Sequence, residues 1–163
     1  MQGWLIGPQF VGALEDRLGA NRVAVQGIEY PAAIVTNVLP SGASPEGVRN
    51  LKDLLNEANQ RCPDSIVLVS GYSQGAAIVH KVFEDGLSAS IKEQIAGVVL
   101  FGDTRNLQTG GRIAGYPSDR TLVICNVGDL VCVGTLVITP AHIGYPARVP
   151  EAVDFLEARV LAV

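Results

Sequence analysis

The chain has 163 residues, of which 48% are hydrophobic and 17% are charged, and its net charge is −4. This length predicts a single domain over residues 1–163, and a sequence so apolar and so weakly charged is not that of a disordered protein. The acidic balance argues against nucleic acid as a partner, and no apolar run reaches the roughly 18 residues that a transmembrane segment needs. The first residues have neither the basic start nor the long apolar run of a signal peptide.

Apolar runs alternate with amphipathic stretches along the chain. Strands that alternate with helices predict an α/β fold with a parallel sheet covered by helices on both faces. The glycine-rich stretch 106–119 has no clear helical pattern and is predicted to be a loop. In chain order the predicted elements are strand 22–26, helix 45–61 with Ser44 as its N-cap, strand 66–70, helix 75–84, helix 91–94, strand 97–101, strand 121–126 and helix 150–161.

The segment Gly71-Tyr72-Ser73-Gln74-Gly75 lies between a predicted strand and a predicted helix. G-x-S-x-G in this context is typical of a nucleophile elbow, a strained turn that presents the serine hydroxyl above the end of the sheet. The alternative is an ordinary glycine-rich turn, because the motif also arises by chance. The flanking elements favour Ser73 as a nucleophile and the Gln74 backbone N–H, at the helix N-terminus, as an oxyanion donor.

A serine nucleophile needs a general base, and the chain has two histidines. His80 follows Ser73 by seven residues, which in a helix is about 10.5 Å along the axis and out of reach of the hydroxyl. We therefore interpret His80 as structural. His142 is left as the predicted base.

Two aspartates follow predicted strands, where the active sites of open α/β sheets lie. Asp103 ends the strand 97–101, and Asp129 lies between Cys125 and Cys132. We favour Asp129 as the acid that orients the histidine, because a disulfide at these cysteines would hold its loop in place. The alternative for Asp129 is a turn residue without a catalytic role.

The chain has three cysteines, Cys62, Cys125 and Cys132, so at least one of them has no partner within the chain. No C-x-x-C and no His/Cys cluster occurs, which argues against a zinc site and against thiol redox chemistry. Cys125 and Cys132 are separated by six residues. A disulfide between them is the favoured interpretation, and it indicates an oxidising compartment.

Taken together, the elbow, the cysteine loop and the histidine loop resemble the cutinases, which are serine esterases of fungi and some bacteria. The matching stretches are CPDSIVLVSGYSQGAAIVH, IAGVVLFGDTRNLQ, YPSDRTLVICNVGDLVC and PAHIGY, in the family's order. The resemblance extends from residue 8 to about residue 160. It implies the three-layer α/β-hydrolase fold, Ser73 as nucleophile, Asp129 as acid, His142 as base, the Gln74 N–H as an oxyanion donor and a Cys125–Cys132 disulfide.

The same resemblance implies a secreted protein without a cofactor or metal that acts on esters of cutin or similar acyl chains. We expect a monomer whose partner is a polymeric or lipid-like ester. No segment is long enough for a helical lid, so we expect a shallow, open site. Apolar residues are expected to form a rim beside His142: Leu130, Val131, Val133, Leu136, Val137, Ile138 and Ile143.

The N-terminus departs from the family pattern. Cutinases begin with a strand and an Arg-Gly-Ser/Thr-like loop that carries the second oxyanion donor, preceded by a cysteine that pairs with the counterpart of Cys62. This chain begins after that loop, so we expect an N-terminally shortened sheet, weak activity and a reactive Cys62. The alternatives to a cutinase-type esterase are an acetylxylan esterase-type carbohydrate esterase and a truncated chain with little or no turnover.

Overall fold

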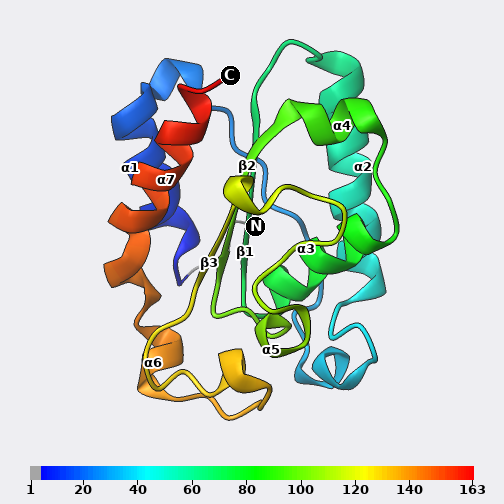
Figure 1. The fold of residues 1–163 in the computed structure, drawn as a ribbon, viewed down its shortest axis with the longest axis vertical. Coiled ribbons are helices and arrows are strands. Elements are labelled where there is room, and N and C mark those ends of the chain that lie inside the picture. The colour runs from blue at the N-terminus through cyan, green and yellow to red at the C-terminus, as the bar shows by residue number, and fades with distance from the viewer. Residues whose placement is uncertain (1–4) are drawn as a thin grey trace.

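A central parallel sheet separates two layers of helices (Figure 1). The computed structural model describes residues 5–163. Within them the sheet has three strands in the order β1-β2-β3, namely β1 (Val67–Tyr72), β2 (Ile95–Phe101) and β3 (Thr121–Ile124). This arrangement confirms the predicted α/β sandwich with a parallel sheet.

The helices divide between the two faces of the sheet. In Figure 1, α1 and α7 stand on one side, and α2, α3 and α4 stand on the other. Helix α2 begins where the sequence predicts, because the Ser44 hydroxyl accepts a hydrogen bond from the Gly47 N–H at 3.4 Å. The helices are α1 (Gly7–Leu18), α2 (Pro45–Arg61), α3 (Gln74–Glu84), α4 (Ala89–Gln94), α5 (Asn106–Thr109), α6 (Pro140–Ile143) and α7 (Val149–Val160).

Strand β2 lies at the centre of the core. Every residue from Ile95 to Phe101 is buried, as expected of a strand covered on both faces. One apolar cluster fills the space between the sheet and α2 and α3, and a second fills the space between the sheet and α1 and α7. Tyr72, Phe101 and Ile124 are paired across the three strands, so the strands' carboxyl ends meet at one edge.

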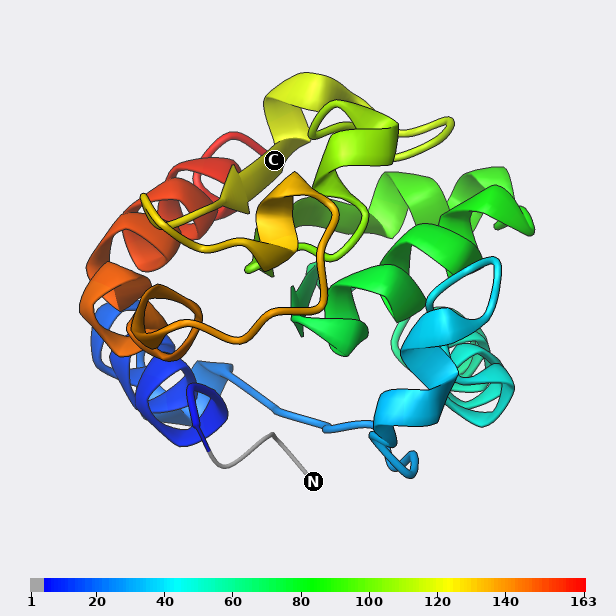
Figure 2. The same cartoon turned by 90° about the horizontal axis from the view of Figure 1, so that it is seen from below.

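The strand predicted over 22–26 does not form. Residues Ala20–Arg22 make a 3₁₀ turn, and residues 23–33 are in neither a helix nor a strand. Val23 has extended backbone angles, but among the described residues no strand lies beside it to pair with its backbone. Figure 2 shows this light-blue segment crossing from α1 to the opposite layer without joining the sheet. The prediction of a fourth strand was therefore wrong.

Other differences concern segments with weak patterns. Helix α1 was not predicted, although Phe10 and Leu14 bury one of its faces in the cluster shared with α7. The loop predicted over 106–119 contains the short helix α5 and a 3₁₀ turn at Ser118–Arg120. The histidine loop contains the short helix α6.

Candidate active site

Ser73 lies in the sharp turn between β1 and α3. Its backbone has φ 53° and ψ −118°, a conformation that residues with a side chain rarely adopt. The turn is held because the Ser73 N–H donates to the Phe101 carbonyl at 2.9 Å. A Cβ atom on Gly71 would lie 2.7 Å from the backbone of Gly75 and Ala76, so the strand and the helix approach too closely for a side chain there.

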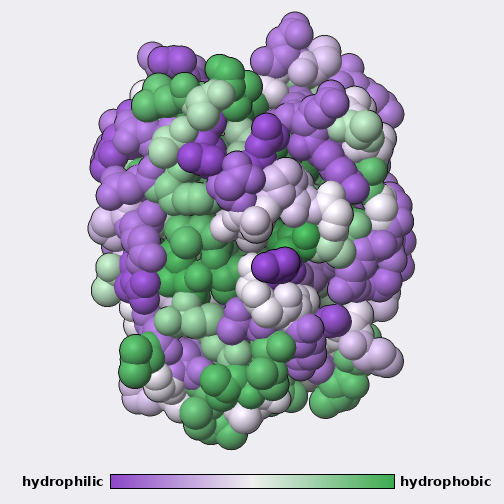
Figure 3. All heavy atoms as spheres, viewed as in Figure 1, coloured by the Kyte–Doolittle hydropathy of each residue, from purple (hydrophilic) through white to green (hydrophobic). Residues whose placement is uncertain are grey.

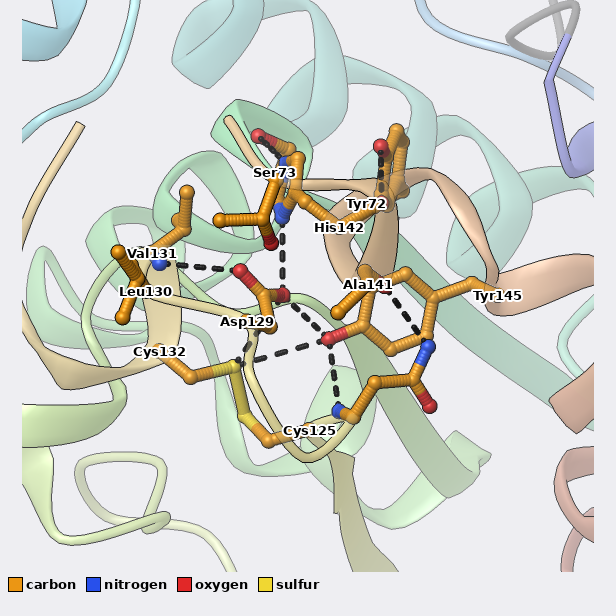
Figure 4. Close-up of polar contacts among 12 residues, drawn as sticks. Tyr72, Ser73, Cys125, Asp129, Leu130, Val131, Cys132, Ala141, His142 and Tyr145 are labelled. Atoms are coloured by element: carbon orange, nitrogen blue, oxygen red, sulfur yellow. Dashed lines mark hydrogen bonds and ion pairs between the residues drawn. A yellow bond between two sulfur atoms is a disulfide. The ribbon is translucent and has the colours of Figure 1, made fainter. Parts of the chain in front are cut away.

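His142 lies within hydrogen-bonding distance of Ser73. Its Nε2 is 3.0 Å from the Ser73 Oγ, and its Nδ1 is 2.9 Å from an Asp129 oxygen, Oδ2 (Figure 4). Because a carboxylate only accepts, the Nδ1–H donates to Asp129 and Nε2 is free to accept the serine proton. The histidine is 2% exposed and the Asp129 side chain is fully buried, so the hydrogen bond between them is shielded from water.

Asp129 is fully engaged by donors inside a closed loop. Its Oδ1 accepts from the Val131 N–H at 2.9 Å, and its Oδ2 accepts from His142 and from the Tyr145 hydroxyl. The predicted disulfide between Cys125 and Cys132 is present and closes the loop that carries Asp129. The carboxylate is thus held in one orientation without contact with solvent.

Asp103, the alternative acid, is bonded to the other histidine. His80 Nε2 lies 2.8 Å from Asp103 Oδ2, and both side chains are buried. The other Asp103 oxygen accepts from the Arg105 N–H at 2.8 Å. The structure therefore contains two His–Asp pairs, and only the Asp129 pair reaches Ser73.

Gln74 is the first residue of α3, so its backbone N–H is one of the helix donors without an intrahelical acceptor. Its side chain has a second role that the sequence did not indicate. The amide Nε2 donates to the Ala33 carbonyl and to the Asn37 Oδ1, each at 3.1 Å, and also contacts the Thr36 hydroxyl. These bonds hold the 3₁₀ segment Ile34–Val38 beside the elbow.

The family model for cutinases matches residues 3–160. The chain is also 51% identical over 154 residues to Cutinase CUT2 of Pyricularia oryzae, a match that covers 94% of this chain and 72% of that protein. It is 46% identical to a cutinase of Fusarium solani subsp. cucurbitae over 162 residues, covering 97% of this chain and 70% of the relative.

The chain belongs to the cutinase family.

Solved structures agree with this assignment. The fold is similar to a Trichoderma reesei cutinase in complex with a phosphonate inhibitor, with a TM-score of 0.84, 32% identity and coverage of 96% of this chain and 68% of that one. An acetylxylan esterase shares the fold with a TM-score of 0.71 at 21% identity, covering 93% of this chain and 88% of the other. As a member of the cutinase family, this protein is a carboxylic ester hydrolase.

Two tyrosines that no local sequence pattern indicated enclose the histidine of this cutinase-family site. The Tyr72 ring stacks on the His142 ring with centroids 5.2 Å apart, and its hydroxyl donates to the His142 carbonyl at 2.8 Å. The Tyr145 ring meets the same imidazole edge-on. Burial, together with the nearby Asp129 charge, raises the pKa of Tyr72 to about 12, so its hydroxyl stays a neutral donor.

Apolar side chains surround the site, although one member of the predicted rim was wrong. Val131 is only 1% exposed, so it is a buried residue and not part of an exposed rim. Its backbone N–H donates to Asp129 Oδ1. In Figure 3 hydrophobic atoms gather at the lower end, where Figure 1 places the segment after β3 and the 3₁₀ segment Ile34–Val38. The exposed apolar residues of these two segments are Val35, Val38, Val127, Leu130, Val133, Leu136, Val137, Ile138 and Ile143.

No helix within residues 5–163 combines the length and the apolar character needed to span a bilayer. In the same part of the chain, histidine, cysteine and acidic side chains do not gather in groups of three or more that would bind a metal ion.

Proposed function

We propose that this cutinase-family enzyme is a serine esterase that hydrolyses cutin or similar acyl esters through an acyl-enzyme on Ser73. The observation that carries the proposal is the continuous chain of hydrogen bonds from Ser73 through His142 to Asp129. A neutral imidazole whose Nδ1–H is bonded to a carboxylate is oriented to accept the serine proton at Nε2.

The acylation step follows from this arrangement. His142 Nε2 takes the Ser73 proton while Oγ attacks the ester carbonyl carbon, and the carbonyl oxygen becomes an oxyanion. The Gln74 backbone N–H donates to that oxyanion, and Asp129 stabilises the imidazolium. The tetrahedral intermediate then expels the alcohol, whose oxygen receives the proton from Nε2.

Deacylation repeats the same steps with water. His142 removes a proton from a water molecule, whose oxygen attacks the acyl carbon. The intermediate collapses to the free acid, and the Ser73 oxygen recovers its proton from the imidazolium. The enzyme returns to its starting state without a cofactor.

The surroundings of the site support an acyl substrate presented by a polymer or a lipid-like surface. Exposed apolar side chains lie on two segments near the elbow, the segment after β3 and the segment Ile34–Val38. Such a surface removes water from acyl chains more favourably than from a carbohydrate. For this reason we favour a cutinase-type substrate over acetylated xylan, which the shared fold alone also permits.

We also propose that the protein is secreted and acts as a monomer. The Cys125–Cys132 disulfide supports secretion, because such bonds persist in oxidising compartments. Sedimentation at working concentration tests the monomer. Assay of the culture medium of the producing organism tests secretion.

The function is tested with Ser73→Ala on a series of p-nitrophenyl esters of increasing chain length and on acetylated xylan. We expect the unaltered enzyme to hydrolyse the acyl esters and to be labelled by a phosphonate at Ser73, and the variant to do neither. The fold should survive, because the half-buried hydroxyl fills no core space. Undiminished turnover in the purified variant would overturn the proposal, and a strong preference for acetylated xylan would overturn the substrate class.

A further inference from the structure

Tyr145 is buried directly behind the Asp129–His142 pair. Its hydroxyl donates to Asp129 Oδ2 at 2.5 Å and accepts from the Asn126 N–H at 3.1 Å. The same Asp129 oxygen accepts the His142 Nδ1–H at 2.9 Å. One carboxylate oxygen therefore receives both the histidine and the tyrosine, as Figure 4 shows.

The direction of the tyrosine hydrogen bond is determined by its neighbours. The phenol oxygen accepts the Asn126 N–H through a lone pair, and its single proton is left to be donated. The proton must then point at Asp129, because a buried carboxylate can only accept. Burial, and then the hydrogen bond to Asp129, raise the pKa of Tyr145 above its ordinary value, so the hydroxyl keeps this proton across the neutral range.

The ring of Tyr145 is fixed as firmly as its hydroxyl. Its exposed fraction is 0%, and it packs edge-on against Phe101, with centroids 6.1 Å apart, in the core beneath α7. It also meets the His142 ring edge-on at 6.1 Å and 89°. The hydroxyl has no room to follow a moving carboxylate, so it restricts the positions that Asp129 can take.

We propose that Tyr145 is a positioning residue, which holds the Asp129 carboxylate in the orientation and charge distribution that His142 needs. This inference rests on the proposed serine esterase reaction. The Tyr145 hydroxyl donates to Asp129 and not to Ser73, so its effect on the reaction passes through Asp129. The inference adds a fourth side chain to the arrangement of Ser73, His142 and Asp129.

Two effects follow from removing the hydroxyl. The Asp129 carboxylate gains freedom to rotate, and we expect this to lower kcat by roughly tenfold, by analogy with the loss of an outer hydrogen-bond partner of a metal ligand. In addition, Oδ2 carries more negative charge and binds the imidazolium more strongly, so the acidic limb of the pH–rate profile moves to higher pH. The two other side chains against the imidazole, Tyr72 and Ser73, are neutral and do not oppose this shift.

The test compares Tyr145→Phe with Tyr116→Phe as a matched control. Tyr116 is also a buried tyrosine, whose hydroxyl donates to the Ile95 carbonyl at 2.6 Å in the cluster on the other face of the sheet. Both variants lose one buried hydroxyl and should lose similar thermal stability. Only Tyr145→Phe should lower kcat with KM unchanged and move the acidic limb upward. If both variants keep the profile of the unaltered enzyme, Tyr145 is merely structural and the inference is wrong.

A second substitution keeps the test decisive if Tyr145→Phe fails to fold. Tyr145→3-fluorotyrosine preserves the size and the hydroxyl but makes the phenol a stronger donor, so the acidic limb should move to lower pH. An unmoved or raised limb would contradict the inference.

Phosphonate labelling of Ser73 counts the active molecules in each sample. Full activity of Ser73→Ala would instead refute the proposed esterase reaction, which separates the two failures.

Discussion

At the residue scale, Asp129 and Asp103 provide a matched pair, since each is buried and each bonds a histidine. Asp129→Asn should lower turnover on the order of 10⁴-fold, because an amide no longer selects the histidine tautomer that accepts from serine. Asp103→Asn should leave turnover within a few-fold and cost about 1–3 kcal/mol of unfolding free energy, because the His80 bond is weakened. Ester turnover and urea unfolding of both variants check this, and a larger activity loss in Asp103→Asn would reverse the assignment of the acid.

The candidate residues Ser73, Asp129 and His142 could be proposed from the sequence for a physical reason. The elbow is a local motif, and with two histidines the base followed by elimination. The tyrosines could not be found in this way. Tyr145 bonds a residue 16 positions away and Tyr72 one 70 positions away, and a contact of that kind leaves no local pattern. Val131 was placed wrongly because an apolar residue in a loop can face either way.

At the element scale, the close crossing of β1 and α3 depends on Gly71 more than on Gly75, the other glycine of the motif. A Cβ at Gly71 would meet backbone atoms at 2.7 Å, whereas at Gly75 it would meet the Tyr30 hydroxyl at 3.6 Å, an ordinary contact. Gly71→Ala should therefore cost about 1–3 kcal/mol of unfolding free energy and reduce turnover by displacing the elbow. Gly75→Ala should fold with a smaller loss. Equal losses in urea unfolding would contradict this explanation.

Elements with strong patterns were predictable, and those that depend on a neighbour were not. Helix α2 has apolar residues at helical spacing and its own N-cap, so both ends were predicted. Strand β2 was predicted from its continuous apolar run. The segment 22–26 has strand-forming residues, but a strand exists only where another backbone pairs with it, and among the described residues β1 pairs with β2 alone.

At the scale of the whole molecule, buried tyrosines predict that the fold weakens in alkali. Burial raises the pKa of Tyr72 and of Tyr116 to about 12, against about 10 in an unfolded chain. Above about pH 10 the unfolded chain releases these protons while the folded protein retains them, so rising pH favours unfolding. The unfolding free energy should fall between about pH 10 and 12, and Tyr116→Phe should flatten this decline. Urea titrations over this range measure it, and a constant free energy would contradict the prediction.

Both histidines of the chain donate a ring proton to a buried aspartate, one at the candidate site and one behind it. For magnetic resonance this makes the molecule unusually simple. Labelling histidine alone introduces two rings, and each has a nitrogen bonded to an aspartate in a buried pair. The His142 ring contacts Ser73, so its signal should change when an acyl or phosphonate group is attached to that serine. The His80 ring lies in the core and serves as an internal reference in the same spectrum.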